Sequence, residues 1–229
     1  MTEHDCRDVH PPGDLSPEPD ASGGGRTVAA MEIVTYPHPA LRWKSTDVKR
    51  IDEPLRAVIR RMFELMYAAN GIGLAANQVA LPFRFFVANL SGEAEEIDEE
   101  LVFINPQIIK RKGTALAEEG CLSLPGLYAD VKRSEGVTVE AFDLDGQLFE
   151  ADLTELGARA VQHEIDHLDG ILFIDRLEEA VREEVAPKVA DFAAEYARRQ
   201  SLGETPTDDE LRARLKQLAD GNGDLSNVR

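Results

Sequence analysis

A histidine pair within residues 162–170 carries the strongest chemical signal in the sequence. His163 and His167 are four residues apart, and Glu164 directly follows the first histidine. On a helix, side chains at this spacing lie on one face about 6 Å apart, so both imidazoles can bind one metal ion. A neighbouring carboxylate can then move a proton to or from a group on that ion. The segment therefore predicts a catalytic metal site with its own base.

The residues before the pair predict that this site is buried. Leu153, Leu156 and Ala160 precede the histidines at helical spacing. A helix that begins near Asp152 or Thr154 would therefore carry one stripe in which apolar residues and ligands share a face. Because such a stripe faces the interior, we expect the metal to lie inside the protein.

A catalytic site of the zinc type needs a third protein ligand and one open position. In metalloproteases with an extended histidine motif, the third ligand is a histidine six residues after the second, but Phe173 stands at that position here. A downstream glutamate could complete the site instead. The candidates of that kind are Glu178, Glu179 and Glu183.

Cys121 is the better candidate for the third ligand. The chain has only one other cysteine, Cys6, which lies in a tail rich in Pro, Gly and Asp. Glycine and proline bracket the extended segment around Cys121, which allows a thiolate and the next backbone N–H to approach a ligand closely. Most free cysteines are small buried hydrophobes, so this residue by itself does not decide the question.

A third stretch, residues 70–78, imitates a dinucleotide-binding fingerprint through Gly71, Gly73 and Ala76. That fingerprint must follow a strand, whereas the preceding residues repeat with helical periodicity. We therefore expect a helix that starts at Asp52 and Pro54 and ends with Gly71 as its C-cap. The apolar positions of this helix are Leu55, Val58, Ile59, Met62, Leu65 and Met66.

Together the three stretches resemble the peptide deformylase family. Its motifs appear here in order, as Gly71–Gln78, Glu119–Ser123 and His163–Gly170. The segment Ile33–Arg42 also resembles the usual first segment of the family. The resemblance spans residues 31–177, and three ordered motifs make it highly specific.

The resemblance implies a complete catalytic site. Water would fill the fourth metal position, and metal-bound hydroxide would attack a formyl carbon while Glu164 handles the protons. The side-chain amide of Gln78 and the backbone N–H of Leu122 would stabilise the oxyanion. The implied metal is one divalent ion, Fe²⁺, although Zn²⁺, Ni²⁺ and Co²⁺ also accept nitrogen and sulfur ligands. The implied ligands are Cys121, His163 and His167.

The implied substrates are nascent polypeptides that carry N-formylmethionine. An extended peptide would pair through its main chain with edges near Gly73 and Gly126. The methionine side chain would lie over Ile72, Leu156 and Ala160. Outside the pocket, the family pattern implies an ion pair between Arg133 and Glu119 that braces the cysteine loop.

The remaining pattern predicts an α+β fold, a single domain in which antiparallel β-sheets pack around the metal-bearing central helix, with a C-terminal helix added. Strands are expected at 83–89 and 101–105. A hairpin is expected from 137–143 and 148–152, which alternate around Asp145–Gly146.

Three regions follow from composition. Residues 1–30 contain few large apolar residues and are expected to form a disordered N-terminal extension, with Met31 as an alternative translation start. Residues 31–177 would form the catalytic domain. Residues 178–229 would form a charged helical extension, with helices over 178–200 and 207–218.

The charge balance restricts the partners. A net charge of −18 disfavours binding to nucleic acid or to an anionic membrane. No stretch of eighteen apolar residues occurs, and the acidic first thirty residues are unlike a presequence. Unpaired cysteines fit a reducing interior. We therefore expect a cytoplasmic protein whose partners are nascent chains and, transiently, the ribosome.

Two other classes of function remain open. A metallopeptidase would need a third ligand after His167. An inactive domain with a structural metal would need four protein ligands, and no fourth is evident.

Overall fold

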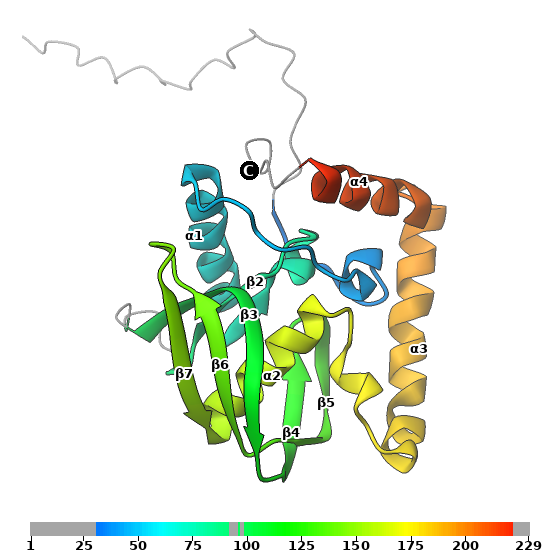
Figure 1. Ribbon diagram of the computed structural model, residues 1–229. Helices are drawn as coiled ribbons and strands as arrows, with labels where there is room; N and C mark the ends of the chain where they lie inside the picture. Colours follow the sequence, from blue (N-terminus) through cyan, green and yellow to red (C-terminus); the bar gives the residue numbers. More distant parts are fainter. Residues whose placement is uncertain (1–30, 92–95, 97–98, 222–229) are drawn as a thin grey trace, which may run out of the picture.

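A computed structural model describes residues 31–91, 96 and 99–221 (Figure 1). The predicted disordered extension, residues 1–30, lies outside the described residues. Within them, helices and antiparallel strands combine as the α+β prediction requires, and the C-terminal helices follow the sheets in sequence.

A five-stranded sheet provides most of the β-structure. The prediction of a hairpin around Asp145–Gly146 is confirmed, with Gly136 opposite Thr154 at its far end. Every neighbouring pair is antiparallel, and the order is β1-β2-β3-β6-β7. The strands are β1 (Gly73–Ala75), β2 (Phe85–Asn89), β3 (Glu100–Lys112), β6 (Gly136–Phe142) and β7 (Leu148–Thr154).

Strand β3 continues well beyond the predicted end at Asn105. Asn105 has a φ of 53°, and the register shifts between Ile104 and Gln107. This bulge accommodates Pro106, which cannot donate to a regular ladder. The Asn105 side chain stabilises the bulge by bonding both the N–H and the C=O of Val48, at 2.8 and 3.0 Å.

A separate two-stranded sheet carries the cysteine loop. It consists of β4 (Ala115–Cys121) and β5 (Leu124–Arg133), with a register shift between Gly120 and Cys121. The sequence predicted only a short extended segment here. Gly120 is required by packing, because a Cβ at that position would lie 2.5 Å from the ring of Tyr128. The sheet thus turns at Leu122–Ser123, next to the cysteine.

Helix α2 (Glu155–Leu168) is the central helix, and the two-stranded sheet lies beside it (Figure 1). Its predicted start is confirmed, with Thr154 as the N-cap. The predicted stripe needs correction, since Leu153 belongs to β7 and Leu156 is 52% exposed in the first helical turn. The helix packs on the large sheet through Ala158, Val161, Ile165 and Leu168.

Helix α1 (Glu53–Ala68) covers the opposite face of the large sheet, where its apolar side chains meet Phe85 and Val87. Its start is as predicted. Asp52 is the N-cap and accepts a hydrogen bond from the N–H of Leu55 at 3.2 Å. Alternate β2 residues, Phe86 and Ala88, face α2 instead. The sheet therefore has a core on each face.

The end of α1 differs from the prediction by one residue. Asn70, not Gly71, adopts the left-handed conformation, with a φ of 54°. The N–H of Asn70 donates to Tyr67 and that of Gly71 to Met66, both at 2.9 Å, which is the Schellman pattern. Gly71 is needed for space, because a Cβ there would lie 2.7 Å from Leu122.

The C-terminal segment forms α3 (Glu179–Ser201) and α4 (Asp208–Asp220), close to the predicted helices. Helix α3 lies on the β5 side of the molecule (Figure 1). Its partly buried Val185, Val189 and Phe192 pack against the core cluster that includes residues of β5. Helix α4 packs on the 3₁₀ helix η1 (Pro39–Arg42). Two further 3₁₀ helices are η2 (Ala76–Val79) and η4 (Phe173–Asp175). Of the helices described, none combines the length and apolarity needed to cross a membrane.

Candidate metal centre and active site

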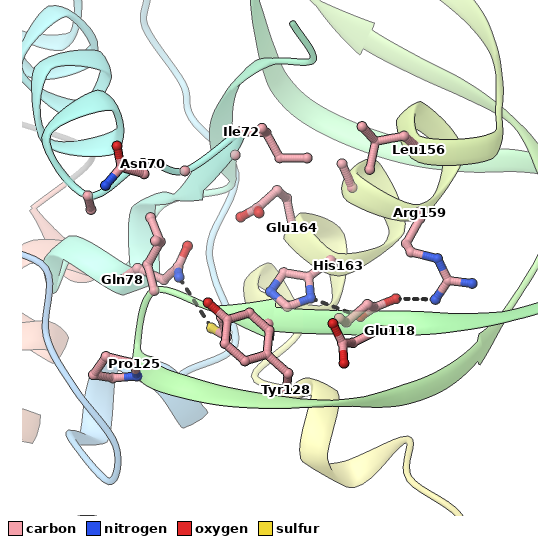
Figure 2. A pocket seen from close by; sticks show the side chains of 18 of the residues that line it. Asn70, Ile72, Gln78, Glu118, Pro125, Tyr128, Leu156, Arg159, His163 and Glu164 are labelled. Carbon is pink, nitrogen blue, oxygen red and sulfur yellow. Dashed lines mark hydrogen bonds and ion pairs between the residues drawn. The ribbon is translucent and has the colours of Figure 1, made fainter. Parts of the chain in front are cut away.

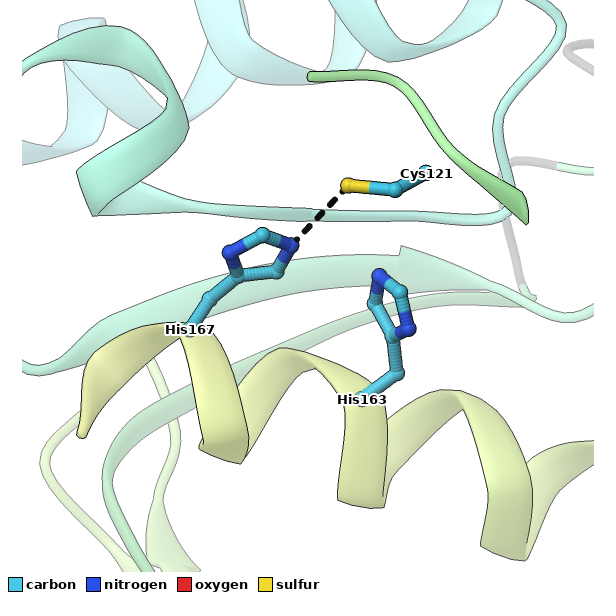
Figure 3. Close-up of side chains that lie close together, drawn as sticks. All are labelled: Cys121, His163 and His167. Carbon is cyan, nitrogen blue, oxygen red and sulfur yellow. Dashed lines mark hydrogen bonds between the residues drawn. The ribbon is translucent and has the colours of Figure 1, made fainter. Parts of the chain in front are cut away.

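The three predicted metal ligands lie together. Cys121 ends β4, while His163 and His167 project from adjacent turns of α2 (Figure 3). Their ligand atoms all lie within 4.8 Å of one another, and Cys121 Sγ is 3.2 Å from His167 Nε2. The downstream glutamates that were the alternative, Glu178, Glu179 and Glu183, are not part of this cluster.

The surroundings of His163 set which ring nitrogen faces a metal. Its Nδ1 lies 3.1 Å from Glu119 Oε2. Because a carboxylate accepts, Nδ1–H donates to Glu119 and the lone pair of Nε2 is left for a cation. A sulfur and two imidazoles suit a tetrahedral ion of the first transition row, with one open position. These residues therefore fit a metal ion.

Two buried polar atoms, one of them on a member of the cluster, lack a hydrogen-bond partner among the described residues. They are Glu164 Oε2 and His167 Nδ1. An unpaired buried polar atom costs free energy, so each one needs an explanation such as a catalytic role or a bound ion. Glu164 thus has one carboxylate oxygen available for a proton or for a group that enters the site.

Burial shifts the titration of the site. It raises the pKa of Glu164 to about 7, despite the opposing charges of His163 and Arg133. It also holds the pKa of His167 well below the ordinary value. For His163 burial acts downward, but the hydrogen bonds to Cys121 and Glu119 outweigh it and raise the pKa to about 10. A cation must displace that proton, so metal affinity should fall as the pH falls.

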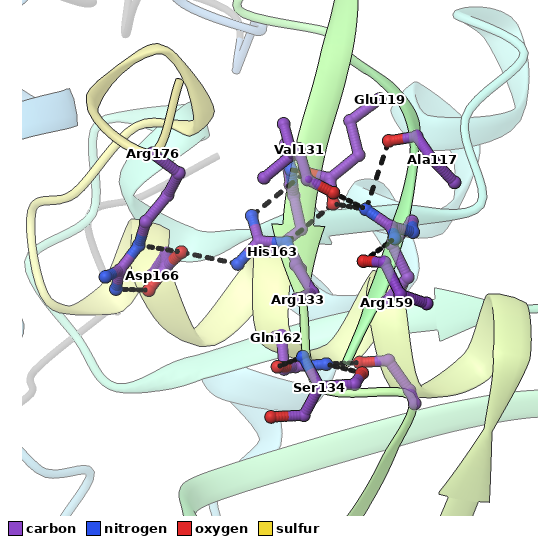
Figure 4. Close-up of polar contacts among 12 residues, drawn as sticks. Ala117, Glu119, Val131, Arg133, Ser134, Arg159, Gln162, His163, Asp166 and Arg176 are labelled. Carbon is purple, nitrogen blue, oxygen red and sulfur yellow. Dashed lines mark hydrogen bonds and ion pairs between the residues drawn. The ribbon is translucent and has the colours of Figure 1, made fainter. Parts of the chain in front are cut away.

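A buried ion-pair network supports the ligands from behind (Figure 4). Arg133 donates to both oxygens of Glu119, at 2.6 and 2.9 Å, which confirms the predicted pair. Arg159 adds a third contact to Glu119 at 2.6 Å. Burial raises the pKa of Glu119, but the hydrogen bonds from His163 and Arg133 bring it down to about 2. Glu119 therefore stays ionised and orients His163.

Gln78 reaches the centre from η2. Its Oε1 accepts the N–H of Ala75 at 2.8 Å, which leaves the amide nitrogen directed toward the cysteine loop. That nitrogen lies 3.6 Å from Cys121 Sγ and 3.4 Å from Ser123 Oγ. The side chain is buried, with an exposed fraction of 1%. Gln78 is thus fixed as a donor beside the metal ligands.

A cavity of about 520 Å³ opens onto the ligands (Figure 2). All five residues predicted to contact substrate line this cavity. Most of the predicted catalytic and ligating residues line it too, whereas His167 is not among the lining residues. The predicted residues in the lining are Ile72, Gly73, Gln78, Cys121, Leu122, Gly126, Leu156, Ala160, His163 and Glu164.

Gly73 makes room for the carboxylate of Glu164. A Cβ at Gly73 would lie 2.6 Å from Glu164 Oε1, closer than real Cβ atoms approach. Gly73 begins β1, which is the terminal strand of the five-stranded sheet. The cavity therefore lies between the β1 edge and β4, which contributes Glu118 to Cys121.

Sequence reasoning missed several lining residues, among them Asn70, Glu118, Pro125, Tyr128 and Arg159. One signal was available, since Arg159 precedes His163 by four residues and so shares its helix face. Tyr128 could not be found in this way. It depends on the register that places it opposite Gly120.

Comparison with known proteins gives a consistent result. The model of the polypeptide deformylase family matches residues 30–183. A peptide deformylase of Rhodopirellula baltica is 44% identical over 173 residues, covering 76% of this chain and 86% of the relative. A peptide deformylase of Acidobacterium capsulatum is 50% identical over 157 residues, covering 69% of this chain and 92% of the relative. A crystal structure of peptide deformylase from Plasmodium falciparum is 38% identical with a TM-score of 0.71, covering 72% of this chain and 97% of that one.

Proposed function

The chain belongs to the peptide deformylase family, whose members are metal-dependent hydrolases that remove N-formyl groups. We therefore propose that it removes the formyl group from the N-terminal formylmethionine of nascent polypeptides, in the cavity beside Cys121. One observation carries the proposal. The three candidate ligands cluster within 4.8 Å, and two of them, Cys121 and His163, line a cavity together with Glu164, whose buried Oε2 has no hydrogen-bond partner among the described residues.

We propose Cys121, His163 and His167 as the ligands of one divalent ion. Fe²⁺ is our first choice, and Zn²⁺, Ni²⁺ and Co²⁺ are the alternatives that the same donor atoms accept. When bound, the cation supplies hydroxide near neutral pH, because it lowers the pKa of a coordinated water toward about 7. Glu119 holds His163 in the tautomer that this role requires.

Glu164 transfers the protons in this proposal. It takes one from the attacking water and passes it to the amine, which cannot leave as an anion. Burial raises its pKa to about 7, so the carboxylate is both basic enough to accept and acidic enough to return a proton. Its Oε2 atom, which has no hydrogen-bond partner among residues that the structure describes, is the one available for this transfer.

Gln78 and Leu122 stabilise the oxyanion that forms when the formyl carbon is attacked. Gln78 already has its oxygen engaged by Ala75, so its amide nitrogen is the group that can donate. The backbone N–H of Leu122 follows the cysteine ligand directly. Fixed donors of this kind need no reorganisation during the reaction.

The substrate binds as an added strand in this proposal. The β1 edge begins at Gly73, and Gly126 lies on the β5 side of the same cavity. Hydrogen bonds between such an edge and the main chain of a peptide do not depend on most of the peptide's side chains. Ile72, Leu156 and Ala160 line the apolar part, where the methionine side chain would lie. The 52% exposure of Leu156 leaves its side chain free to cover a ligand.

The setting of the reaction is also a proposal. We expect the enzyme to act in the cytoplasm on chains as they emerge, with transient contact to the ribosome. A net charge of −18 argues that such contact does not go directly through RNA.

The test is an assay of anaerobically purified protein on a formylmethionyl peptide, together with metal analysis. We expect one metal ion per chain, release of formate, loss of activity on chelation and recovery with Fe²⁺. An unformylated peptide with the same sequence serves as the control. Cleavage of its internal bonds would favour the metallopeptidase alternative, and failure to release formate from a metal-loaded protein would overturn the proposal.

A further inference from the structure

A second cavity, of about 450 Å³, shares no lining residue with the active-site cavity. Strand β3, the β3–β4 turn, the end of β5, helix α2 and the segment after η4 all contribute to it. Arg133 belongs to its lining and also contacts Glu119 of the first cavity. The lining residues are Arg111, Thr114, Lys132, Arg133, Ser134, Gln162, Asp166 and Arg176.

This cavity is positively charged in a chain whose net charge is −18. Its lining contains four cationic side chains and one carboxylate, Asp166. Asp166 is shared by two guanidinium groups, since Arg133 contacts it at 2.7 Å and Arg176 at 2.6 Å (Figure 4). The other partner of Arg133, Glu119, is shared with Arg159. The carboxylates are thus outnumbered by the cations around them.

Two of the cations have no ionic partner within the part of the chain that the structure describes. Arg111 donates to the neutral amide oxygen of Gln162 at 3.1 Å, and neither it nor Lys132 forms an ion pair there. Both are exposed at the mouth of the cavity. The nearby carboxylate of Glu135 packs against Gly113 and is not part of the lining. An excess of positive charge therefore remains to be neutralised.

The chemistry of the lining matches an oxyanion. Guanidinium groups present paired N–H donors that fit phosphate, and an ammonium group adds a point charge. The hydroxyl of Ser134 supplies a neutral donor at the same cavity, whereas that of Thr114 already donates to the carbonyl of Gly113 at 2.8 Å. We propose that this cavity binds a small phosphate-bearing anion between Arg111, Lys132 and Arg176. An RNA backbone is a poorer match, because the acidic surface of the whole chain repels a polyanion.

Binding of this anion should stabilise the protein. It would offset the unbalanced charge on Arg111 and Lys132 and hold the end of β5 against α2. A ligand that binds only the folded state stabilises it by RT ln(1 + L/Kd), where L is the free ligand concentration, so the melting temperature rises with ligand concentration. We therefore expect inorganic phosphate to raise the melting temperature at constant ionic strength, when it replaces chloride.

The test uses the metal-loaded protein and inorganic phosphate, with calorimetric titration and thermal unfolding at fixed ionic strength. The double variant Arg111→Gln/Lys132→Gln removes the two unpaired cations. The double variant Lys110→Gln/Lys112→Gln changes the net charge equally on residues that do not line the cavity. We expect the first variant to bind phosphate at least roughly tenfold more weakly, because each lost contact is charge-assisted. The second should bind as the wild type does.

The other outcomes are also decisive. Equal phosphate affinity in the two variants would place the anion elsewhere, for example on the metal, and would overturn the proposal. Absence of saturable phosphate binding to the wild type would overturn it too, as would binding confined to a single-stranded RNA oligonucleotide. Metal content and formate release should be the same in all three proteins, so failure of this proposal is distinguishable from failure of the proposed deformylation.

Discussion

A substitution of Glu164 would separate the proposed proton transfer from metal binding at the level of one residue. Its Oε2 atom has no described partner, and the metal cluster contains three other side chains. We expect Glu164→Gln to keep metal content and melting temperature while lowering kcat roughly 100- to 10,000-fold, because only acid–base chemistry is lost. Assays of formate release, together with metal analysis of the variant and the wild type, check this expectation. Loss of metal in proportion to activity would instead make Glu164 a ligand.

Cys121 is the proposed ligand that distinguishes this site from one completed by a downstream glutamate. Its sulfur lies 3.2 Å from His167 Nε2. We expect Cys121→Ser to lose most of its metal, since a hydroxyl is a harder and far less acidic donor than a thiol. Metal per chain after dialysis is the measurement, and the wild type treated in parallel is the control. Full retention of metal would point to another third ligand.

Gln78 tests the oxyanion role separately from ligation. Its amide nitrogen is directed at the cysteine loop, and its oxygen is held by the N–H of Ala75. We expect Gln78→Ala to keep the metal and to lower kcat by a factor corresponding to about 3 kcal/mol, the typical value of one lost donor. Gln78→Glu, which keeps the acceptor oxygen but removes the donor, is the matched variant. An unchanged kcat in both would exclude Gln78 from the reaction.

The elements show where local patterns suffice. Asp52 and Pro54 define the start of α1 because an N-cap and an early proline act within one turn. The end of α1 was assigned one residue late, because asparagine also tolerates the left-handed conformation that Asn70 adopts. The β4–β5 sheet was missed for a different reason. Strand β4 has a single buried residue, Glu119, and no apolar alternation, so only its pairing with β5 defines it.

The same distinction applies to the candidate site. His163 and His167 could be identified because few residue types bind a transition metal, so type and spacing were informative. Cys121 was a candidate by residue type, and only the resemblance to the family implied that it is the third ligand. Tyr128 and Glu118 could not be identified, because they reach the cavity only through the register of the β4–β5 pair. Arg133 sits at an inward position of β5, where alternation predicts an apolar residue, and it is buried only because Glu119 and Asp166 neutralise it.

Helix α3 is joined to the rim of the active-site cavity. Lys188 donates to the carbonyl of Gly126, a lining residue with a φ of 70°. We expect Lys188→Met, which keeps the aliphatic stem, to raise KM for a formyl peptide about two- to tenfold. That range corresponds to the net free energy of one lost hydrogen bond. The kcat and metal content should not change.

Arg198→Met is the matched control on α3, because Arg198 pairs with Glu195 and does not line the cavity. An equal rise in KM in both variants would indicate a general effect of helix charge. An unchanged KM in Lys188→Met would show that the contact does not position the rim.

At the scale of the whole molecule, His38 connects the first segment to the C-terminal helices. Its ring is buried and packs edge-on against Tyr196, at 6.4 Å between centroids. Burial lowers its pKa to about 4, with Asp208 raising it and Arg214 lowering it further. His38 therefore stays neutral in the folded protein at pH values where the unfolded chain would already protonate it, from about pH 6.5 downward.

The sign of the pH effect follows from that difference. A folded-state pKa below the unfolded value means that stability is lost as the pH falls from about 6.5 to about 4, in total on the order of 3 kcal/mol. We expect His38→Asn, whose side-chain oxygen can still accept the N–H of Ala40, to lose less stability over this range. Urea unfolding of both proteins at several pH values measures the difference. Parallel curves would assign the pH dependence to other groups.

The proposed metal ion would also act as a crosslink. Cys121 and His163 are 42 residues apart (163 − 121), and the segment between them contains β5, β6 and β7. Closing a loop of that length with a covalent bond would restrict the unfolded ensemble by on the order of 4 kcal/mol in chain-entropy models. A second set of contacts closes nearly the same loop without metal, because Glu119 contacts His163 and Arg159. Removal of the metal by a chelator would therefore break one of two crosslinks that close this loop. The chain without metal would keep the folded site, so that a new ion can bind.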